Sequence, residues 1–362
     1  MHTEKKRLYY LDVLRVIGMC SIVFLHFSVP GWWQTDSSSW WGYNIFHSGT
    51  RWAVPLFFMI SGALFLNTQR EMPLKKLGLH MLKLILVFSV GKFLYGQLAF
   101  FTNPDFGSFS ISNILRGFGD EMRNSQFTYQ FWFLTALLAL YMIVPLLRGF
   151  VKNASKQEIM FFLTLTILAD TGLWVIIQYC PIAIFTQLAQ QFSFTYVTGY
   201  IGVFVLGWCL SNWQLSKKTR IALYLTGGLC VLWVLLYSVY AAKNGGSTDA
   251  LYSYTMLQNI LPAAAVFTFV RQLCTDKEPL KIVSLLAKTA MGVYLLHTLF
   301  TQLIRITPNL WQMVYSHNGI WTVPVYGGLV VIVCSFFTLI WFQLVKWIQP
   351  KKQPTFAVSR EE

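Results

Sequence analysis

Residues 10–26 read YLDVLRVIGMCSIVFLH, an apolar run that carries three ionisable side chains, Asp12, Arg15 and His26. Asp12 and Arg15 are three positions apart, so they are neighbours on one face of a helix. His26 follows Arg15 by eleven residues, which at about 100° per residue returns to within roughly 20° of the same face. We therefore expect a helix with a single polar stripe, along which Arg15 and His26 lie about 16 Å apart.

Apolar runs of this kind recur along the whole chain. Of the 362 residues, 55% are hydrophobic and 12% are charged, whereas a soluble domain has about 25% charged residues. Runs near twenty apolar residues predict transmembrane helices. We expect an all-α polytopic membrane protein with one domain over 1–362. The ten predicted spans are 8–29, 50–67, 77–101, 128–147, 157–178, 194–212, 219–241, 254–271, 283–304 and 323–347.

The connections between the spans differ in charge. Nineteen Lys and Arg residues lie at the two ends of the chain and in the connections on their side, against three in the opposite connections. Because basic residues are retained on the cytoplasmic side, both termini are predicted to be cytoplasmic. Arg15 interrupts the first run and no small-residue cleavage site follows it, so we expect a retained first span. The net charge of +14 is thus topogenic, and no nucleic-acid partner is expected.

Charged groups inside a span usually face the protein interior or a water-filled cavity. The stripe of Asp12, Arg15 and His26 is therefore the leading candidate site. In the alternative interpretation, Asp12 and Arg15 only neutralise one another and His26 caps the helix at the interface.

Other ionisable groups in the spans are less informative by themselves. His297 shares a helical face with Tyr294, three residues before it, although a lone histidine is more often a hydrogen-bonded core residue. Arg51, at the outer end of the second span, is equally well explained by snorkelling. Lys83 and Lys288 are expected to snorkel, and Arg305 to anchor an outer end. No role follows for Lys92 or Asp170.

Several kinds of site are excluded by their motifs. The chain lacks the phosphate-binding loop G-x-x-x-x-G-K-[ST], and also lacks H-E-x-x-H and G-x-S-x-G. The six cysteines form no C-x-x-C, so neither a metal site nor a disulfide framework is expected. The H-x-x-x-D pattern of soluble acyltransferases is also missing.

The first span resembles the first helix of the membrane acyltransferases of acyltransferase family 3. That family has an arginine, a histidine at the distance found here, and an aspartate three residues before the arginine. Asp12, Arg15 and His26 match these positions. Three further segments resemble later helices of the family in the same order. They are RWAVPLFFMISGALFL at 51–66, FWFLTALLALYMIVPLLR at 131–148 and MGVYLLHTLF at 291–300.

The resemblance implies transfer of an acyl group, usually acetyl, from cytoplasmic acetyl-CoA or another acyl-CoA to a sugar hydroxyl. The acceptor would be a cell-envelope polysaccharide or its lipid-linked precursor, reached from the inner (cytoplasmic) membrane. It implies catalytic roles for His26 as general base, for Arg15, which would position the acyl-CoA arm, and for Asp12, which would orient Arg15. Arg51, Tyr294, His297 and Trp132 would bind substrate. Gln130 departs from the family, which often has a histidine two residues before the tryptophan.

A membrane transporter or flippase for a lipid-linked sugar or small solute is the main alternative. Its polar stripe would serve as a proton or substrate path. Such proteins usually show two related halves with broken helices at matching positions, and no internal repeat is evident in this sequence. A non-enzymatic scaffold gives no reason for the stripe. The sequence leaves homo-oligomerisation, the acceptor glycan and the acyl group open.

Overall fold

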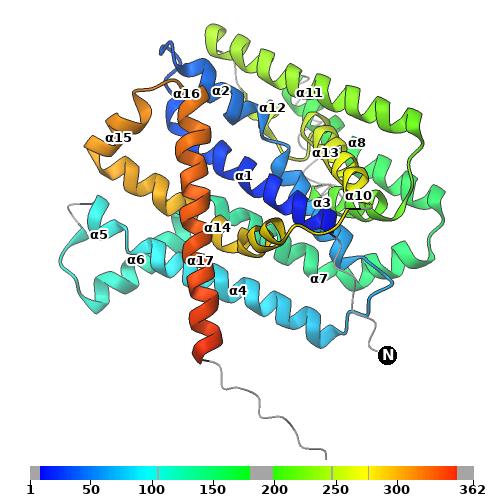
Figure 1. The fold of residues 1–362 in the computed structure, drawn as a ribbon, viewed down its shortest axis with the longest axis horizontal. Helices are drawn as coiled ribbons and strands as arrows, with labels where there is room; N and C mark the ends of the chain where they lie inside the picture. Colours follow the sequence, from blue (N-terminus) through cyan, green and yellow to red (C-terminus); the bar gives the residue numbers. More distant parts are fainter. Residues whose placement is uncertain (1–8, 104–105, 180–198, 246–247, 276, 349–362) are drawn as a thin grey trace, which may run out of the picture.

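The computed structural model describes residues 9–103, 106–179, 199–245, 248–275 and 277–348 (Figure 1). In this part of the chain the regular secondary structure is helical, without strands. The helices that coincide with predicted spans are α1 (Tyr9–Trp32), α3 (Ala53–Phe65), α4 (Leu74–Gly96), α7 (Trp132–Asn153), α8 (Lys156–Tyr179), α10 (Tyr200–Asn212), α11 (Lys217–Asn244), α13 (Leu257–Leu273), α14 (Lys281–Ile306) and α17 (Gly328–Ile348). The other helices are α2 (Trp40–Gly49), α5 (Ala99–Thr102), α6 (Ile111–Asn124), η2 (Tyr129–Phe131), α12 (Asp249–Tyr252), α15 (Pro308–Tyr315), α16 (Gly319–Thr322) and η4 (Val323–Gly327).

Each predicted span falls on one helix of the first set, although residue 8 of the first span and residues 194–198 of the sixth lie outside the described part. Six helical stretches within the described residues are long and apolar enough to cross a membrane. They are Tyr9–Trp32, Leu74–Thr102, Tyr129–Asn153, Lys217–Asn244, Lys281–Ile306 and Gly319–Trp347. The prediction of an all-α, multi-pass membrane protein is confirmed.

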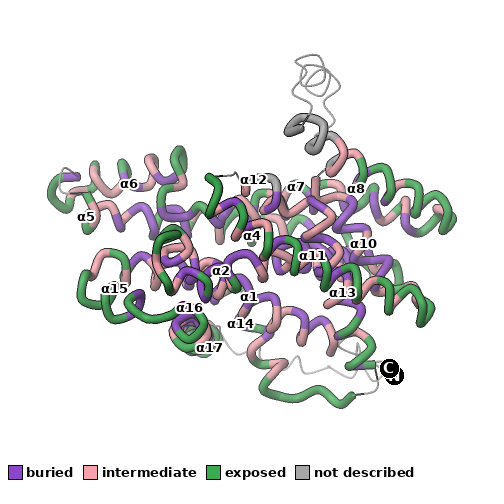
Figure 2. Tube along the Cα trace, turned by 90° about the horizontal axis from the view of Figure 1, so that it is seen from above, coloured by how far each residue is buried: buried purple, intermediate pink, exposed green. Residues whose placement is uncertain are grey.

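Helix α1 lies at the centre of the molecule. It packs against α2, α3, α13, α14 and α17, and Figure 2 shows buried positions gathered around it with exposed positions at the periphery. Its apolar side chains, such as Leu14 and Phe27, are fully buried. A central position also explains how one helix can bury Asp12 completely, because that side chain meets protein on every side. Helix α17 differs from its neighbours, since it runs across them in Figure 1.

Helices α3 and α10 cross with their backbones in close contact. A Cβ atom at Gly62 would overlap the carbonyl oxygen of Phe204, and one at Gly207 would overlap that of Met59. Only glycine at both positions allows the two backbones to touch. Small residues serve this purpose in membrane helix pairs, where dispersion contacts and close backbone approach replace the hydrophobic effect.

Two of the connections that are predicted to lie on the outer side contain helices. Helix α2 lies between the first and second spans, and α6 between the third and fourth. Helix α6 starts at Ser110, whose hydroxyl accepts the amide N–H of Asn113, and it ends at Ser125 in the left-handed conformation. These two connections place further side chains beside the end of α1 that carries His26.

Candidate active site

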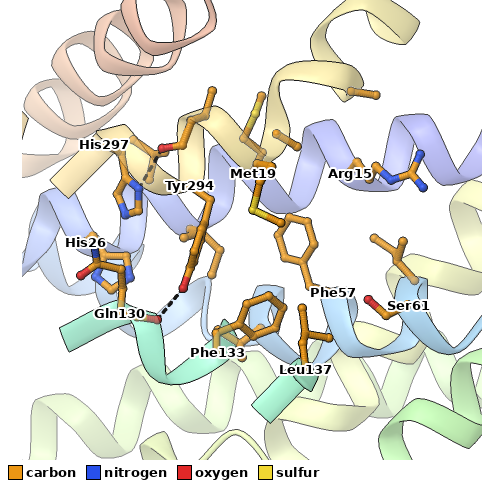
Figure 3. A pocket seen from close by; sticks show the side chains of 18 of the residues that line it. Arg15, Met19, His26, Phe57, Ser61, Gln130, Phe133, Leu137, Tyr294 and His297 are labelled. Carbon is orange, nitrogen blue, oxygen red and sulfur yellow. Dashed lines mark hydrogen bonds between the residues drawn. The ribbon is translucent and has the colours of Figure 1, made fainter. Parts of the chain in front are cut away.

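A cavity of about 280 Å³ runs along α1 (Figure 3). Its lining includes Arg15, Met19, Ile22, Val23 and His26, which are spaced as one face of a helix requires. The shared face predicted for Arg15 and His26 is thus confirmed. Because α1 is helical throughout Tyr9–Trp32, the rise between these two residues is about 16 Å.

One end of the cavity is basic. Arg15 and Lys288 both line it there, and Lys288 is exposed. Arg15 donates a 2.8 Å hydrogen bond to the carboxylate of Asp12, which also accepts the hydroxyl of Ser284 at 3.2 Å. Asp12 is fully buried behind Arg15, so it orients the guanidinium from the protein side. Lys288 is more than a snorkelling residue, since it forms part of the cavity wall.

The middle of the cavity is apolar. Phe57 and Leu64 of α3 face Phe133 and Leu137 of α7, and Met291 of α14 contributes a further wall. Figure 3 shows Phe57, Phe133 and Leu137 between the Arg15 end and the histidine end. Such a lining suits a narrow uncharged chain and disfavours a hydrated ion.

Two histidines meet at the other end. The rings of His26 and His297 have centroids 5.1 Å apart, and both residues line the cavity. Nδ1 of His297 lies 3.0 Å from the carbonyl oxygen of Val293. A carbonyl oxygen only accepts, so Nδ1 carries the proton and the neutral ring has its lone pair on Nε2. That Nε2 is buried and has no partner among the described residues.

A turn before α7 covers the histidine pair. The Tyr129 hydroxyl lies 3.0 Å from Nδ1 of His26. Gln130 accepts the hydroxyl of Tyr294 on its backbone oxygen at 2.6 Å and donates its side-chain amide to Thr298 at 2.7 Å. Gln130 therefore binds α14 to the turn. Tyr129 could not be singled out from the sequence, because its contact with His26 joins positions 103 residues apart.

Trp132 also lines the cavity, as its predicted binding role requires. Its ring stacks on Tyr254 with centroids 5.4 Å apart and planes 13° apart, and on Tyr200 at 5.7 Å. Tyr254 is a second lining residue that the sequence did not single out.

Arg51 lies beside this site and is absent from the described cavity wall. Its guanidinium donates to Nε2 of His47 at 2.7 Å, contacts the hydroxyl of Tyr254 at 3.4 Å, and sits 3.9 Å from the centre of the Tyr252 ring. Burial first, then the charge of Arg51 and that of His26, holds the pKa of His47 well below its ordinary value. His47 thus accepts from Arg51 as a neutral ring.

The described residues contain no group of three side chains suited to hold a metal ion. The side chain of Asp170 lies outside the described residues.

Comparison with known proteins identifies the family. The family model described as an acyltransferase domain, acyltransferase 3, matches residues 8–339. No curated protein and no solved structure gives a significant match. The matched range includes α1, the turn at Tyr129 and the α14 segment with His297, so it contains the whole cavity. The chain belongs to the acyltransferase 3 family and is a multi-pass membrane acyltransferase.

Proposed function

We propose that this protein transfers an acyl group, acetyl in the first instance, from cytoplasmic acyl-CoA to a hydroxyl of a cell-envelope polysaccharide or its lipid-linked precursor. The observation that carries the proposal is the cavity itself. It joins a basic end at Arg15 to a histidine pair at His26 through an apolar passage.

The size of the cavity favours a donor that enters by its narrow arm. About 280 Å³ is just under the usual range for ligand pockets, about 300–1,000 Å³. That volume suits the acyl-pantetheine arm and leaves the nucleotide outside. The CoA diphosphate would then meet Arg15 and Lys288 at the basic end, while the thioester would reach the histidine pair.

The proposed chemistry needs one proton acceptor and no covalent enzyme intermediate. His26 takes the proton of the acceptor hydroxyl as the oxygen attacks the thioester carbonyl. The tetrahedral intermediate breaks its carbon–sulfur bond, and the CoA thiolate takes the proton from the His26 imidazolium. The products are the O-acyl sugar and CoA. His297 accepts a substrate hydrogen bond on Nε2, which is otherwise unpartnered among the described residues.

The remaining predicted residues surround this reaction. Asp12 orients Arg15 through their 2.8 Å bond. Trp132 and Tyr294 shape the wall near the histidines. We retain Arg51 as the source of positive charge for the oxyanion. The Arg51 guanidinium is bound to His47 and also contacts the hydroxyl of Tyr254, which lines the cavity. In this role its charge stabilises the oxyanion from the side of the cavity that Tyr254 forms.

The acceptor class follows from the kind of relative that the sequence resembles. We take it from the resemblance of the sequence to family members such as the enterobacterial common antigen O-acetyltransferase. We accordingly place the protein in the inner (cytoplasmic) membrane, with the donor on the cytoplasmic side and the glycan on the other. Both termini would be cytoplasmic, as the charge distribution predicts.

Radiolabelled acetyl-CoA tests the proposal directly. Membranes from cells expressing the full chain are supplied with the label, and the glycan fraction is counted for wild type, His26→Ala and Arg15→Ala. We expect label with wild type and loss with both variants. His317→Ala, an exposed histidine, is the matched control and should label fully.

Two outcomes would contradict the proposal. Full labelling by His26→Ala and Arg15→Ala, with normal insertion, would place the site elsewhere. Uptake of a sugar into vesicles without any acyl label would favour the transporter.

A further inference from the structure

The turn that carries Tyr129 contacts the reacting histidine from outside the cavity. The Tyr129 hydroxyl and Nδ1 of His26 are 3.0 Å apart, and the two rings meet edge to face with centroids 5.3 Å apart. Since Nδ1 is engaged with Tyr129, the nitrogen that serves a substrate must be Nε2. The position of Tyr129 therefore decides how the His26 ring is presented.

A buried carboxylate holds this turn. Glu121, in the last turn of α6, accepts the backbone N–H of Phe127 at 3.1 Å to each oxygen and that of Thr128 at 2.8 Å. It also accepts the hydroxyl of Thr128. Thr128 immediately precedes Tyr129, so the carboxylate fixes the backbone one residue before the aromatic ring.

The Glu121 carboxylate is itself held by a buried lysine from a different helix. Lys92 of α4 is 1% exposed. Its ammonium donates to the backbone oxygen of Glu121 at 2.9 Å and to the hydroxyl of Ser125 at 2.5 Å, and lies 3.8 Å from the Glu121 carboxylate. Ser125 ends α6 with φ +50°, the one left-handed residue other than glycine in the described chain. Lys92 thus holds both the Glu121 carboxylate and the left-handed residue Ser125.

Stability alone is a poor reason for such an arrangement. A buried ion pair is often no more stabilising than apolar residues of the same volume, whereas its hydrogen bonds have strict geometric requirements. Five of these bonds converge on the segment between Glu121 and Thr128. These hydrogen bonds fix the position of the next residue, Tyr129.

We propose that Lys92 and Glu121 are a positioning pair that holds Tyr129 against His26, and that Tyr129 keeps the proton of neutral His26 on Nδ1. The inference rests on His26 acting as general base in the proposed acyl transfer. Nδ1–H donates to the Tyr129 oxygen, and the lone pair of Nε2 takes the proton of the acceptor hydroxyl. The same hydrogen bond supports the imidazolium until Nε2 returns that proton to the CoA thiolate.

A double-mutant cycle tests the positioning role. Tyr129→Phe, Lys92→Met and the combined variant are prepared in membranes of the full chain. Initial rates of glycan labelling are measured over a range of radiolabelled acetyl-CoA concentrations. We expect each single variant to lower kcat by about 10- to 100-fold, as the loss of an orienting histidine partner does elsewhere. The KM for acetyl-CoA should stay within about twofold of wild type, because neither side chain is placed on the donor's path.

The combined variant measures whether the effect of Lys92 depends on Tyr129. If Lys92 acts through Tyr129, then Lys92→Met should cost less than about twofold in a chain that already carries Tyr129→Phe. Asp120→Asn is the matched control. Asp120 belongs to the same helix and forms an ion pair with Arg123 at 3.0 Å, but that pair is exposed. This substitution should leave both kinetic constants unchanged.

Two results would overturn the inference. One is an equal loss from Lys92→Met with and without Tyr129→Phe, and the other is an unchanged kcat for Tyr129→Phe. If the Lys92→Met protein does not insert into the membrane, the double substitution Lys92→Met with Glu121→Gln is used, because it removes both buried charges together. It is measured in the wild-type chain and in the chain that carries Tyr129→Phe. Absence of label with the wild-type chain would refute the proposed function itself. Label with wild type and an unaffected Tyr129→Phe would refute only the positioning role.

Discussion

His297 donates the N–H of Nδ1 to the carbonyl oxygen of Val293, 3.0 Å away and one helical turn earlier. The bond leaves a lone pair on Nε2 that is buried and unpartnered among the described residues. A buried polar atom without a partner costs about 1–3 kcal/mol of stability. A side chain retained in spite of such a cost is a candidate for function, because activity and stability compete at active sites.

Replacing this histidine should therefore separate activity from stability. We expect His297→Leu to lower acyl transfer by about 10-fold, because one hydrogen bond to the substrate is lost, while the melting temperature in detergent stays equal or rises. His80→Leu, which changes a partly buried histidine on α4, should keep its activity. A His297→Leu protein that loses activity and melting temperature together would indicate a structural histidine instead.

Lys288 offers a test of the basic end, because it is exposed and lines the cavity. Lys288→Glu replaces attraction for the CoA phosphates by repulsion, which should raise the KM for acetyl-CoA by roughly tenfold at low salt. The effect should shrink as salt is added, and kcat should change little. Lys281→Glu, on the same helix but outside the cavity wall, is the control. Equal effects of the two variants would mean that the phosphates respond to overall charge.

Arg15 and Asp12 should show the coupling of a partly buried ion pair. Asp12 is fully buried, so Arg15→Met removes a cation that lies 2.8 Å from a buried carboxylate. We expect a loss of up to about 3 kcal/mol, reduced because the Arg15 side chain is 26% exposed. Arg15→Met with Asp12→Asn also removes the charge of the buried carboxylate and should recover part of the melting temperature, yet remain inactive. A double variant less stable than Arg15→Met would show that the carboxylate is held mainly by other partners.

The sequence predicted those parts of the molecule that depend on short-range patterns. Apolar runs located the helices, and the eleven-residue spacing placed Arg15 and His26 on one face of α1. The pattern could not show which side chains from distant segments complete the site. Tyr129 reaches His26 only because α6, its bend at Ser125 and the Lys92–Glu121 pair bring the turn there. Arg51 shows the same limit, since its bond to His47 depends on α2, a helix that lies between the first two predicted spans.

His47 should make the stability of the fold depend on pH. Its pKa is lower in the folded protein than in the unfolded chain, mainly because the ring is buried and then because Arg51 is adjacent. The contribution of neutral His47 to the free energy of unfolding is fully present above the unfolded pKa of about 6.5. It declines as the pH falls below that value. His47→Gln keeps an oxygen acceptor for Arg51 but cannot titrate. We expect its melting temperature to fall less than that of wild type as the pH is lowered from about 7 to about 5. Parallel curves for the two proteins would rule out His47 as a source of the dependence.

The contact between α3 and α10 should be the least tolerant of added volume. At Gly62 the obstacle is the carbonyl oxygen of Phe204, which a new Cβ would overlap, and a backbone atom cannot turn aside as a side chain can. Gly62→Ala must therefore separate the helices, at a cost of about 1–3 kcal/mol.

Gly62→Ala should lower the acyltransferase activity as well as the stability, because α3 carries Phe57 and Leu64 of the cavity wall. Gly228→Ala on α11 is the matched control, since nothing lies within 4 Å of its new Cβ. There the better helix propensity of alanine should stabilise by up to about 1 kcal/mol. Thermal unfolding in detergent measures both changes. Equal melting temperatures for the two variants would show that α3 and α10 are packed less closely than the glycine contacts indicate.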